Sequence, residues 1–116
     1  MSGLIVYGIT NCDTVKKARK WLDDHRIVYE FHDYKKQGID AGRLLRWSTA
    51  VGWERLLNRS GTTFRKLADA DKLKIDEGKA LALMAKQPSM IRRPVIENGA
   101  ELIVGFDPDR YRALIS

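Results

Sequence analysis

The fold is decided by the segment LIVYGITNCDTVKKARKWLDDHRIVYEFHDY (residues 4–34). Its first part, residues 4–8, is a short β-branched and aromatic run that ends in glycine, which predicts a buried strand. From Asp13 to His25 the apolar side chains of Val15, Ala18 and Leu22 fall at i, i+3 and i+7, which predicts an amphipathic helix facing a sheet. Residues 27–34 alternate as a second strand. A strand, helix and strand in this order imply a right-handed crossover and parallel pairing.

The rest of the chain is first helical and then returns to strands. Residues 40–87 read as helices, the first capped by Asp40, and Pro88 ends the last one. Asn98–Gly99 between two apolar runs predicts a hairpin, and Asp107 followed by Pro108 predicts a terminal helix. The sequence therefore predicts an α/β fold with a thioredoxin-like mixed sheet, made of βαβ plus a C-terminal ββα. A helical subdomain is inserted after the second strand, at about residues 40–87 of a single domain spanning residues 1–116.

Composition sets limits on the class of protein. The chain is 44% hydrophobic and 31% charged, as in soluble domains, and no apolar run approaches the roughly 18 residues that span a bilayer. We expect no signal peptide, because residues 1–8 have no basic leader and no long apolar stretch. One cysteine cannot form an internal disulfide, so a cytoplasmic location is expected. The net charge is +6, but acids alternate with the bases. This favours solvated helix faces, with an anionic small molecule or an acidic partner as the alternative, and no direct nucleic-acid partner is expected.

Cys12 is the only cysteine in the chain. A lone cysteine is most often a small buried hydrophobe, and that interpretation stays open. However, Cys12 falls in the turn between the first strand and the first helix, where ligands bind in open α/β sheets. The unpaired N–H groups of a helix N-terminus lower the pKa of a thiol, and the thiolate is the reactive form. Asn11 or Thr10 could cap the helix, while Lys16 adds to the positive potential and Asp13 opposes it.

A second feature is the segment PSMIRRPVI (residues 88–96), in which Arg93 precedes Pro94. Proline is tolerated at the start of a strand, although it cannot donate to the ladder. In thioredoxin-like folds a cis-proline at this place lies beside the active thiol. An ordinary trans bond and an exposed arginine pair are the alternatives.

Five blocks of the sequence resemble the ArsC/Spx/YffB family, and most closely its YffB-like branch. They are YGITNCDTVKKARKWL, FHDYKKQGID, LLNRSGTTFRKL, PSMIRRPVI and LIVGFD, and together they span nearly the whole chain. The resemblance implies that Cys12 is a nucleophile and that Arg93 is an arginine that holds an oxyanion. It also places Arg59 near another oxyanion arginine, although the position that aligns best is Asn58.

The sequence departs from this family at three places. Arsenate reductases of the family carry an arginine after the glycine of the last strand, where this chain has Gly105–Phe106, and a Gly/Ser-rich loop after the cysteine, where it has DTVKK. Because each missing charged contact to a tetrahedral oxyanion costs roughly 1.5–3 kcal/mol, arsenate reduction is the lesser enzymatic alternative. The Spx branch uses a C-x-x-C switch, and Val15 stands where the second cysteine would be.

Two functions follow as expectations. The first is a glutathione-dependent monothiol oxidoreductase in which the Cys12 thiolate forms a mixed disulfide that an external thiol resolves. It has no bound cofactor, and its reductant is glutathione or a glutaredoxin-like protein. The residues expected to bind substrate or glutathione are Asn11, Lys16, Arg59, Arg93 and Pro94. The alternative is an Spx-like regulator that binds RNA polymerase or another partner. His25 and His32 lack partners at ligand spacing, so no metal site is expected.

Overall fold

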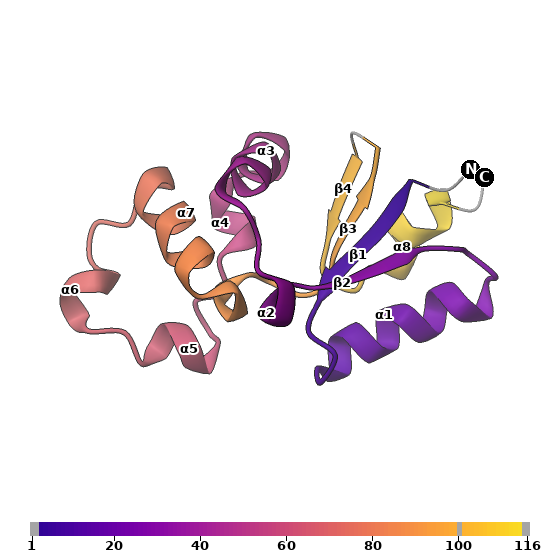
Figure 1. The fold of residues 1–116 in the computed structure, drawn as a ribbon, viewed down its shortest axis with the longest axis horizontal. Coiled ribbons are helices and arrows are strands. Elements are labelled where there is room, and N and C mark those ends of the chain that lie inside the picture. Colours follow the sequence, from indigo (N-terminus) through magenta and orange to yellow (C-terminus); the bar gives the residue numbers. More distant parts are fainter. Residues whose placement is uncertain (1–2, 100, 115–116) are drawn as a thin grey trace. The chain divides into compact units, whose positions relative to one another are not determined.

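The computed structural model describes residues 3–99 and 101–114, and the chain forms two compact units. The first unit consists of residues 1–37 and 93–116, and the second of residues 38–92 (Figure 1). The first contains the sheet and the second contains helices. In the part of the chain that the structure describes, no helix is long and apolar enough to span a membrane.

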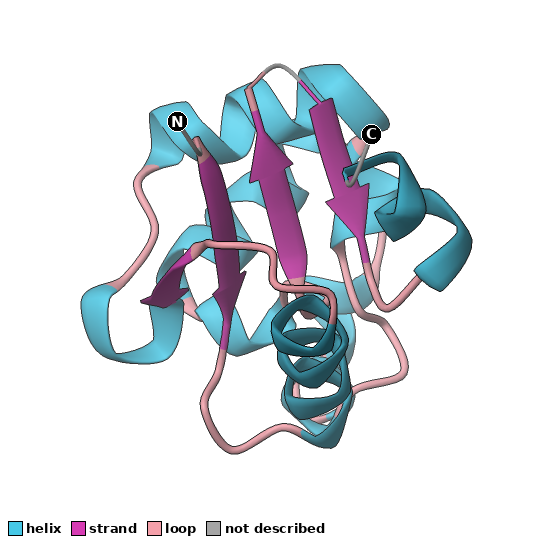
Figure 2. Ribbon diagram, turned by 90° about the vertical axis from the view of Figure 1, so that its right-hand side faces the viewer, coloured by secondary structure: helices cyan, strands magenta, loops and turns pink. Residues whose placement is uncertain are grey.

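The first unit is built on a four-stranded sheet with the order β2-β1-β3-β4 (Figure 2). The strands are β1 (Leu4–Gly8), β2 (Glu30–Asp33), β3 (Val95–Asn98) and β4 (Glu101–Val104). β1 and β2 are parallel, whereas β3 is antiparallel to both of its neighbours, β1 and β4. The predicted crossover and the predicted hairpin are therefore confirmed. In the hairpin, Asn98 still belongs to β3, Gly99 takes a positive φ of 62°, and position 100 lies outside the described residues.

Two helices cover one face of this sheet. α1 (Asp13–Asp24) buries Val15, Ala18 and Leu22, as predicted, and α8 (Pro108–Tyr111) begins at the expected Asp107 cap. The helices and strands share one cluster of buried side chains, which are Leu4, Val6, Ala18, Leu22, Ile96, Ile103 and Tyr111. A short 3-10 turn, η2 (Arg112–Leu114), follows α8. This strand order, with its crossover helix and C-terminal hairpin, is a thioredoxin-like mixed α/β fold.

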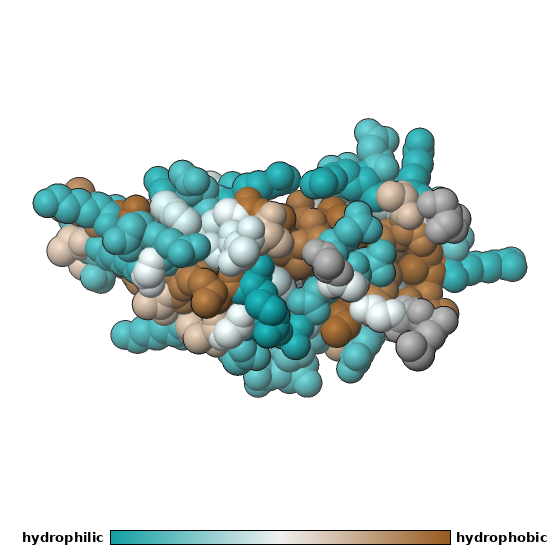
Figure 3. Space-filling model, turned by 90° about the horizontal axis from the view of Figure 1, so that it is seen from above, coloured by the Kyte–Doolittle hydropathy of each residue, from teal (hydrophilic) through white to brown (hydrophobic). Residues whose placement is uncertain are grey.

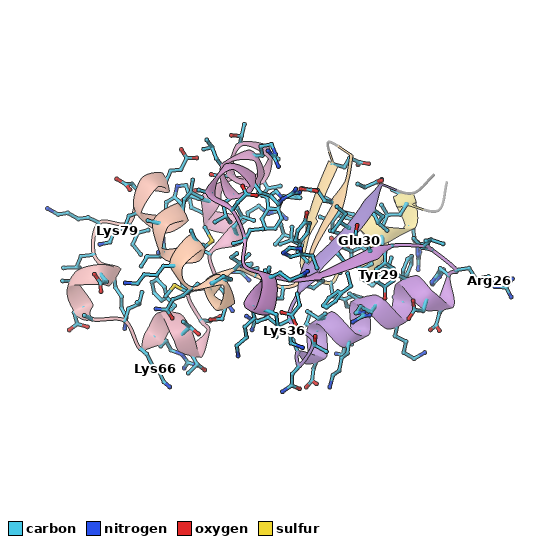
Figure 4. All side chains as sticks on the ribbon, viewed as in Figure 1. Arg26, Tyr29, Glu30, Lys36, Lys66 and Lys79 are labelled. Atoms are coloured by element: carbon cyan, nitrogen blue, oxygen red, sulfur yellow. The ribbon has the colours of Figure 1, made fainter. Side chains whose placement is uncertain are left out.

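The second strand is shorter than the sequence pattern predicts. Residues 27–34 were expected to form it, but β2 begins only at Glu30, because the N–H of Ile27 donates to the carbonyl of Leu22 at 2.9 Å and so ends α1. β2 ends at Asp33, and Tyr34 opens α2 (Tyr34–Gln37). Tyr29, the residue before β2, lies toward α1, where its hydroxyl accepts a hydrogen bond from Nε of Arg19 at 3.0 Å (Figure 4).

The second unit contains helices within the predicted range. They are α3 (Ala41–Val51), α4 (Trp53–Leu56), α5 (Thr62–Arg65), α6 (Asp69–Lys72), α7 (Glu77–Lys86) and the 3-10 turn η1 (Pro88–Met90). Asp40 caps α3 as predicted, since its carboxylate accepts from the N–H of Arg43 at 2.7 Å. Before α7 the chain is held by Nζ of Lys79, labelled in Figure 4, which donates to the carbonyls of Ala70 and Leu73.

Hydrophilic side chains project over much of the face seen in Figure 3. This agrees with the interpretation of the alternating charges as solvated helix faces. On one of these faces, that of α1, Lys20 and Asp24 form an exposed ion pair, with Nζ of Lys20 2.8 Å from Oδ2 of Asp24. Pairs of this kind contribute little to stability.

Candidate functional site

Cys12 is the N-cap residue of α1, at the end of the loop that leaves β1. Its backbone is extended, with φ −141° and ψ 125°. The expectation that Asn11 or Thr10 caps the helix is wrong. The hydroxyl of Thr10 instead donates to Oδ2 of Asp33 at 2.8 Å, and Asn11 is exposed. The thiol therefore occupies the position nearest to the free N–H groups of the helix.

The surroundings of Cys12 favour its thiolate. Partial burial raises the pKa of the Cys12 thiol, but three groups together outweigh it. These are the N–H of Val15, the guanidinium of Arg93, which both hydrogen-bonds to the sulfur and attracts it electrostatically, and the N–H of Thr14. The net effect is a pKa below the ordinary value of a cysteine. The predicted effect of a helix N-terminus on this thiol is thus present, and Arg93 adds to it.

Arg93 and Pro94 enter the same unit from the far end of the sequence. The Arg93–Pro94 peptide bond is cis, and Pro94 is buried just before β3. The carbonyl of Pro94 accepts from the N–H of Gly105 at 2.8 Å, so the segment is fixed to the residue that follows β4. The trans alternative for the bond before Pro94 is therefore wrong. The exposed arginine pair is also not found, because Arg92 is exposed but Arg93 is partly buried.

The Arg93 guanidinium also reaches Tyr34, the first residue of α2. The Tyr34 side chain is fully buried, and this burial raises the pKa of its hydroxyl well above the ordinary value. A hydrogen bond and the positive charge from Arg93 act in the opposite direction, while the nearby Cys12 and Asp33 raise the pKa further. Tyr34 therefore stays a neutral phenol beside the guanidinium. The sequence pattern assigned this residue to a strand and gave it no role.

Asp33, at the end of β2, was also missed by the sequence reasoning. It is 8% exposed, and its carboxylate accepts hydrogen bonds from Thr10 Oγ1 and from the N–H groups of Lys35 and Lys36. Burial raises the pKa of the Asp33 carboxyl, but the hydrogen bonds from these donors and from the N–H of Thr10 lower it by more than burial raises it. The net pKa is therefore below its usual range. The side chain of Lys36 itself projects from α2 (Figure 4). The signal was available, because Asp33 ends a strand parallel to the one that leads to Cys12.

The remaining predicted residues lie at the surface. Lys16 is exposed on the first turn of α1, where its N–H donates to the carbonyl of Cys12 at 2.9 Å. Arg59 is exposed in the second unit, with its guanidinium 5.6 Å from the centre of the Trp53 ring. The structure thus brings Cys12, Arg93 and Pro94 together within the first unit. The ligand roles of all five predicted binding residues stay predictions; these are Asn11, Lys16, Arg59, Arg93 and Pro94. Among residues 3–99 and 101–114, no group of three or more His, Cys, Asp or Glu side chains could hold a metal ion.

This fold and this site define a thioredoxin-fold protein with one activated thiol at the start of its first helix. The model of the ArsC family matches residues 7–114, and the chain belongs to that family. A solved structure named YffB protein is 56% identical, with a TM-score of 0.94, and covers 97% of this chain and 99% of its own. An arsenate reductase related protein from Brucella melitensis is also 56% identical, with a TM-score of 0.78 and coverage of 97% and 93%. The global transcriptional regulator Spx of Streptococcus mutans is 32% identical over 108 residues, which are 90% of this chain and 77% of that protein.

Proposed function

We propose that the protein is a glutathione-dependent monothiol oxidoreductase with Cys12 as its nucleophile. The observation that carries the proposal is the contact of the Arg93 guanidinium with the Cys12 thiol at the N-cap of α1. A helix N-terminus and a cation together raise the thiolate fraction at neutral pH, and the thiolate is the form that attacks disulfides. Membership of the ArsC family and the 56% identity to an arsenate reductase related protein support an enzyme of the thiol-reductase class.

The proposed reaction proceeds in two exchange steps. The Cys12 thiolate attacks the glutathione sulfur of a mixed disulfide, the S–S bond breaks, and the substrate sulfur leaves with the electron pair and takes a proton from water. A second glutathione, as thiolate, then attacks the sulfur bound to Cys12, which releases oxidised glutathione and restores the Cys12 thiolate. The mixed disulfide of the substrate is thereby reduced to a thiol, and one free glutathione is consumed, which leaves joined to the glutathione from the substrate as oxidised glutathione. An external thiol is required because Cys12 is the only cysteine in the chain.

In this proposal the residues around the thiol bind glutathione. Arg93 stabilises the thiolate and pairs with a carboxylate of the tripeptide, since a guanidinium offers a planar set of donors that fits carboxylates. The backbone beside Pro94 pairs with the tripeptide backbone. Asn11 and Lys16, which lie before and after Cys12 and are exposed, are proposed as further contacts.

The proposal is tested by the pH dependence of Cys12 alkylation, followed by mass spectrometry, together with turnover of a glutathione mixed disulfide. We expect a midpoint below the free-thiol value of about 8.5, an adduct of Cys12 with glutathione, and turnover that Cys12→Ser abolishes. A midpoint at or above that value, or a protein with neither adduct nor turnover, contradicts the proposal. Adding arsenate to the same glutathione assay tests the lesser enzymatic alternative.

A second candidate is an Spx-like regulatory protein that binds RNA polymerase or another partner, with Cys12 as a redox sensor or as a relic without a role. It is favoured by the 32% identity to the Spx regulator of Streptococcus mutans, although Val15 in place of a second cysteine means that it has no internal C-x-x-C switch. The two candidates differ in their dependence on the thiol. Recovery of RNA polymerase with the protein, unchanged by Cys12→Ser, together with absence of turnover would favour the regulator.

A further inference from the structure

The Asp33 carboxylate joins two segments of the first unit through its two oxygens. Oδ1 accepts from the N–H groups of Lys35 at 3.0 Å and Lys36 at 3.2 Å, which fixes the carboxylate to the first turn of α2. Oδ2 accepts from the hydroxyl of Thr10 at 2.8 Å. The N–H of Asp33 donates to Oε1 of Gln37 at 3.1 Å, so the residue is held from both its backbone and its side chain.

Thr10 lies in the loop that carries the thiol. This loop leaves β1 after Gly8 and ends at Cys12, where α1 begins, so its middle belongs to no strand or helix. A segment of this kind depends on side-chain hydrogen bonds for a fixed conformation, because no ladder holds it. A bond to a carboxylate is charge-assisted and stronger than a bond between neutral groups. The Thr10–Asp33 contact is therefore suited to fix the loop two residues before the sulfur.

We propose that Asp33 is a positioning residue which, through Thr10, holds the loop so that the Cys12 sulfur faces the start of α1 and Arg93. The inference rests on the proposed function, since it concerns the nucleophile of that reaction. Among the hydrogen bonds that the Asp33 carboxylate accepts from Thr10, Lys35 and Lys36, the one from the Thr10 hydroxyl leads to the loop that carries the thiol. The contacts that depend on this geometry are those of the sulfur with the N–H groups of Val15 and Thr14 and with the Arg93 guanidinium.

Positioning and simple charge effects predict opposite signs, which makes the role testable. A carboxylate near a thiol disfavours the thiolate, so by charge alone Asp33→Asn would lower the pKa of Cys12. If Asp33 instead positions the loop, the same substitution raises it. In asparagine one carboxylate oxygen becomes an NH₂ group that cannot accept, so either the Thr10 bond or the bonds to α2 are lost.

The experiment compares Thr10→Val, Thr10→Ser and Asp33→Asn with the unchanged protein, using the pH midpoint of Cys12 alkylation. Thr10 is exposed, so Thr10→Val removes the hydroxyl without opening the core, and it leaves the net charge unchanged. We expect both Thr10→Val and Asp33→Asn to raise the midpoint and to slow alkylation at neutral pH by about threefold to tenfold, where tenfold corresponds to one pKa unit. Thr10→Ser keeps the hydroxyl and is expected to restore the original midpoint. Circular dichroism confirms that each variant is folded.

The matched control is Asp24→Asn, which removes the same charge at the far end of α1. Asp24 lies 12 residues along the chain from Cys12, or roughly 18 Å along a helix. The midpoint of Cys12 alkylation in Asp24→Asn is expected to equal that of the unchanged protein. The positioning role alone is overturned by the following result. The alkylation midpoint of the unchanged protein is below the free-thiol value, Thr10→Val has the same midpoint, and Asp33→Asn has a still lower one. A midpoint at or above about 8.5 in the unchanged protein overturns the proposed function and the inference with it.

Discussion

The guanidinium of Arg93 lies against the thiol of Cys12, although the two residues come from opposite ends of the chain. The register of the sheet explains the contact. Tyr7 near the end of β1 pairs with Val95 at the start of β3, so the exit from β1 and the entry to β3 lie at the same edge. The loop to α1 leaves the sheet there, and the Arg93–Pro94 segment enters it there. The antiparallel pairing of β1 with β3 is therefore what assembles the thiol and its cation.

Replacing Arg93 is expected to raise the pKa of Cys12. Arg93→Met removes both the hydrogen bond and the positive charge that favour the thiolate, so the alkylation midpoint moves upward and alkylation at neutral pH slows by about tenfold for each pKa unit. Arg93→Lys keeps the charge without the planar donors, so its alkylation midpoint is expected to fall between those of the unchanged protein and Arg93→Met. Arg92→Met is the matched control, because Arg92 is the exposed neighbour and loses the same charge. Equal midpoints for Arg93→Met and Arg92→Met would contradict the role of Arg93.

Gly8 is required by the close approach of α1 to the end of β1. A Cβ at this position would lie 2.9 Å from Cγ2 and 3.2 Å from Cγ1 of Val15, and Val15 is fully buried. We expect Gly8→Ala to lower the free energy of unfolding by about 1–3 kcal/mol, as overpacking does. Urea denaturation measures the change.

A double-mutant cycle separates this steric cause from other effects of the alanine. Val15→Ala alone is destabilising because it removes buried methyl groups, but it also removes the atoms that a Cβ at Gly8 would meet. The double variant is expected to be more stable than the sum of the two single changes implies. Strict additivity of the two changes would show that the contact of Gly8 with Val15 is not the cause.

Local patterns predicted several elements of both units well. Periodicity placed Val15, Ala18 and Leu22 on the buried face of α1, and the caps at Asp40 and Asp107 lie at the expected residues. These predictions succeeded because each depends on residues a few positions apart. The start of β2 was wrong by three residues, because a bond from Ile27 back to Leu22 completes the end of α1, and hydrophobic alternation does not report that bond.

The candidate site was predicted only in part, for a related reason. The sequence indicated Cys12 from its place after a strand, and Arg93 with Pro94 from a motif and a resemblance. It did not indicate that Thr10 would bind Asp33 instead of capping α1. Both uses of a threonine hydroxyl are chemically reasonable, and the choice depends on how β2 pairs with β1. Long-range pairing of this kind is not encoded in any short stretch of the chain.

Asp33 is expected to make the stability of the protein depend on acid pH. The pKa of its carboxyl is lowered in the folded state, so its contribution is present above the unfolded value of about 3.9 and is lost as the pH falls through the folded value. At neutral pH we expect Asp33→Asn to be less stable by about 1.5–3 kcal/mol, the range for a hydrogen bond to a charged group. Below pH 4 or so the difference narrows, because the native carboxyl becomes protonated.

Urea denaturation at a series of pH values checks this expectation. The comparison is with Asp24→Asn, in which an exposed carboxylate of α1 is replaced and the acid limb of the stability curve is expected to keep its shape. A constant difference between Asp33→Asn and the unchanged protein from neutral to acid pH would show that the Asp33 carboxyl is not perturbed.

Tyr34 and Tyr111 are expected to resist ionisation while the protein is folded. Burial raises the pKa of each hydroxyl well above the ordinary value of about 10, and the Tyr111 hydroxyl also donates to the carbonyl of Gly105 at 2.6 Å. Both groups keep their protons in the native state and release them in the unfolded chain, so stability falls as the pH rises above that ordinary value. An alkaline titration followed by phenolate absorbance is then expected to show a late, unfolding-linked step. Tyr34→Phe and Tyr111→Phe each reduce the amplitude of that late step and leave the earlier reversible amplitude unchanged. If Tyr34→Phe instead removed amplitude from the reversible step, the Tyr34 hydroxyl would be open to solvent, and its place beside Arg93 would have to be revised.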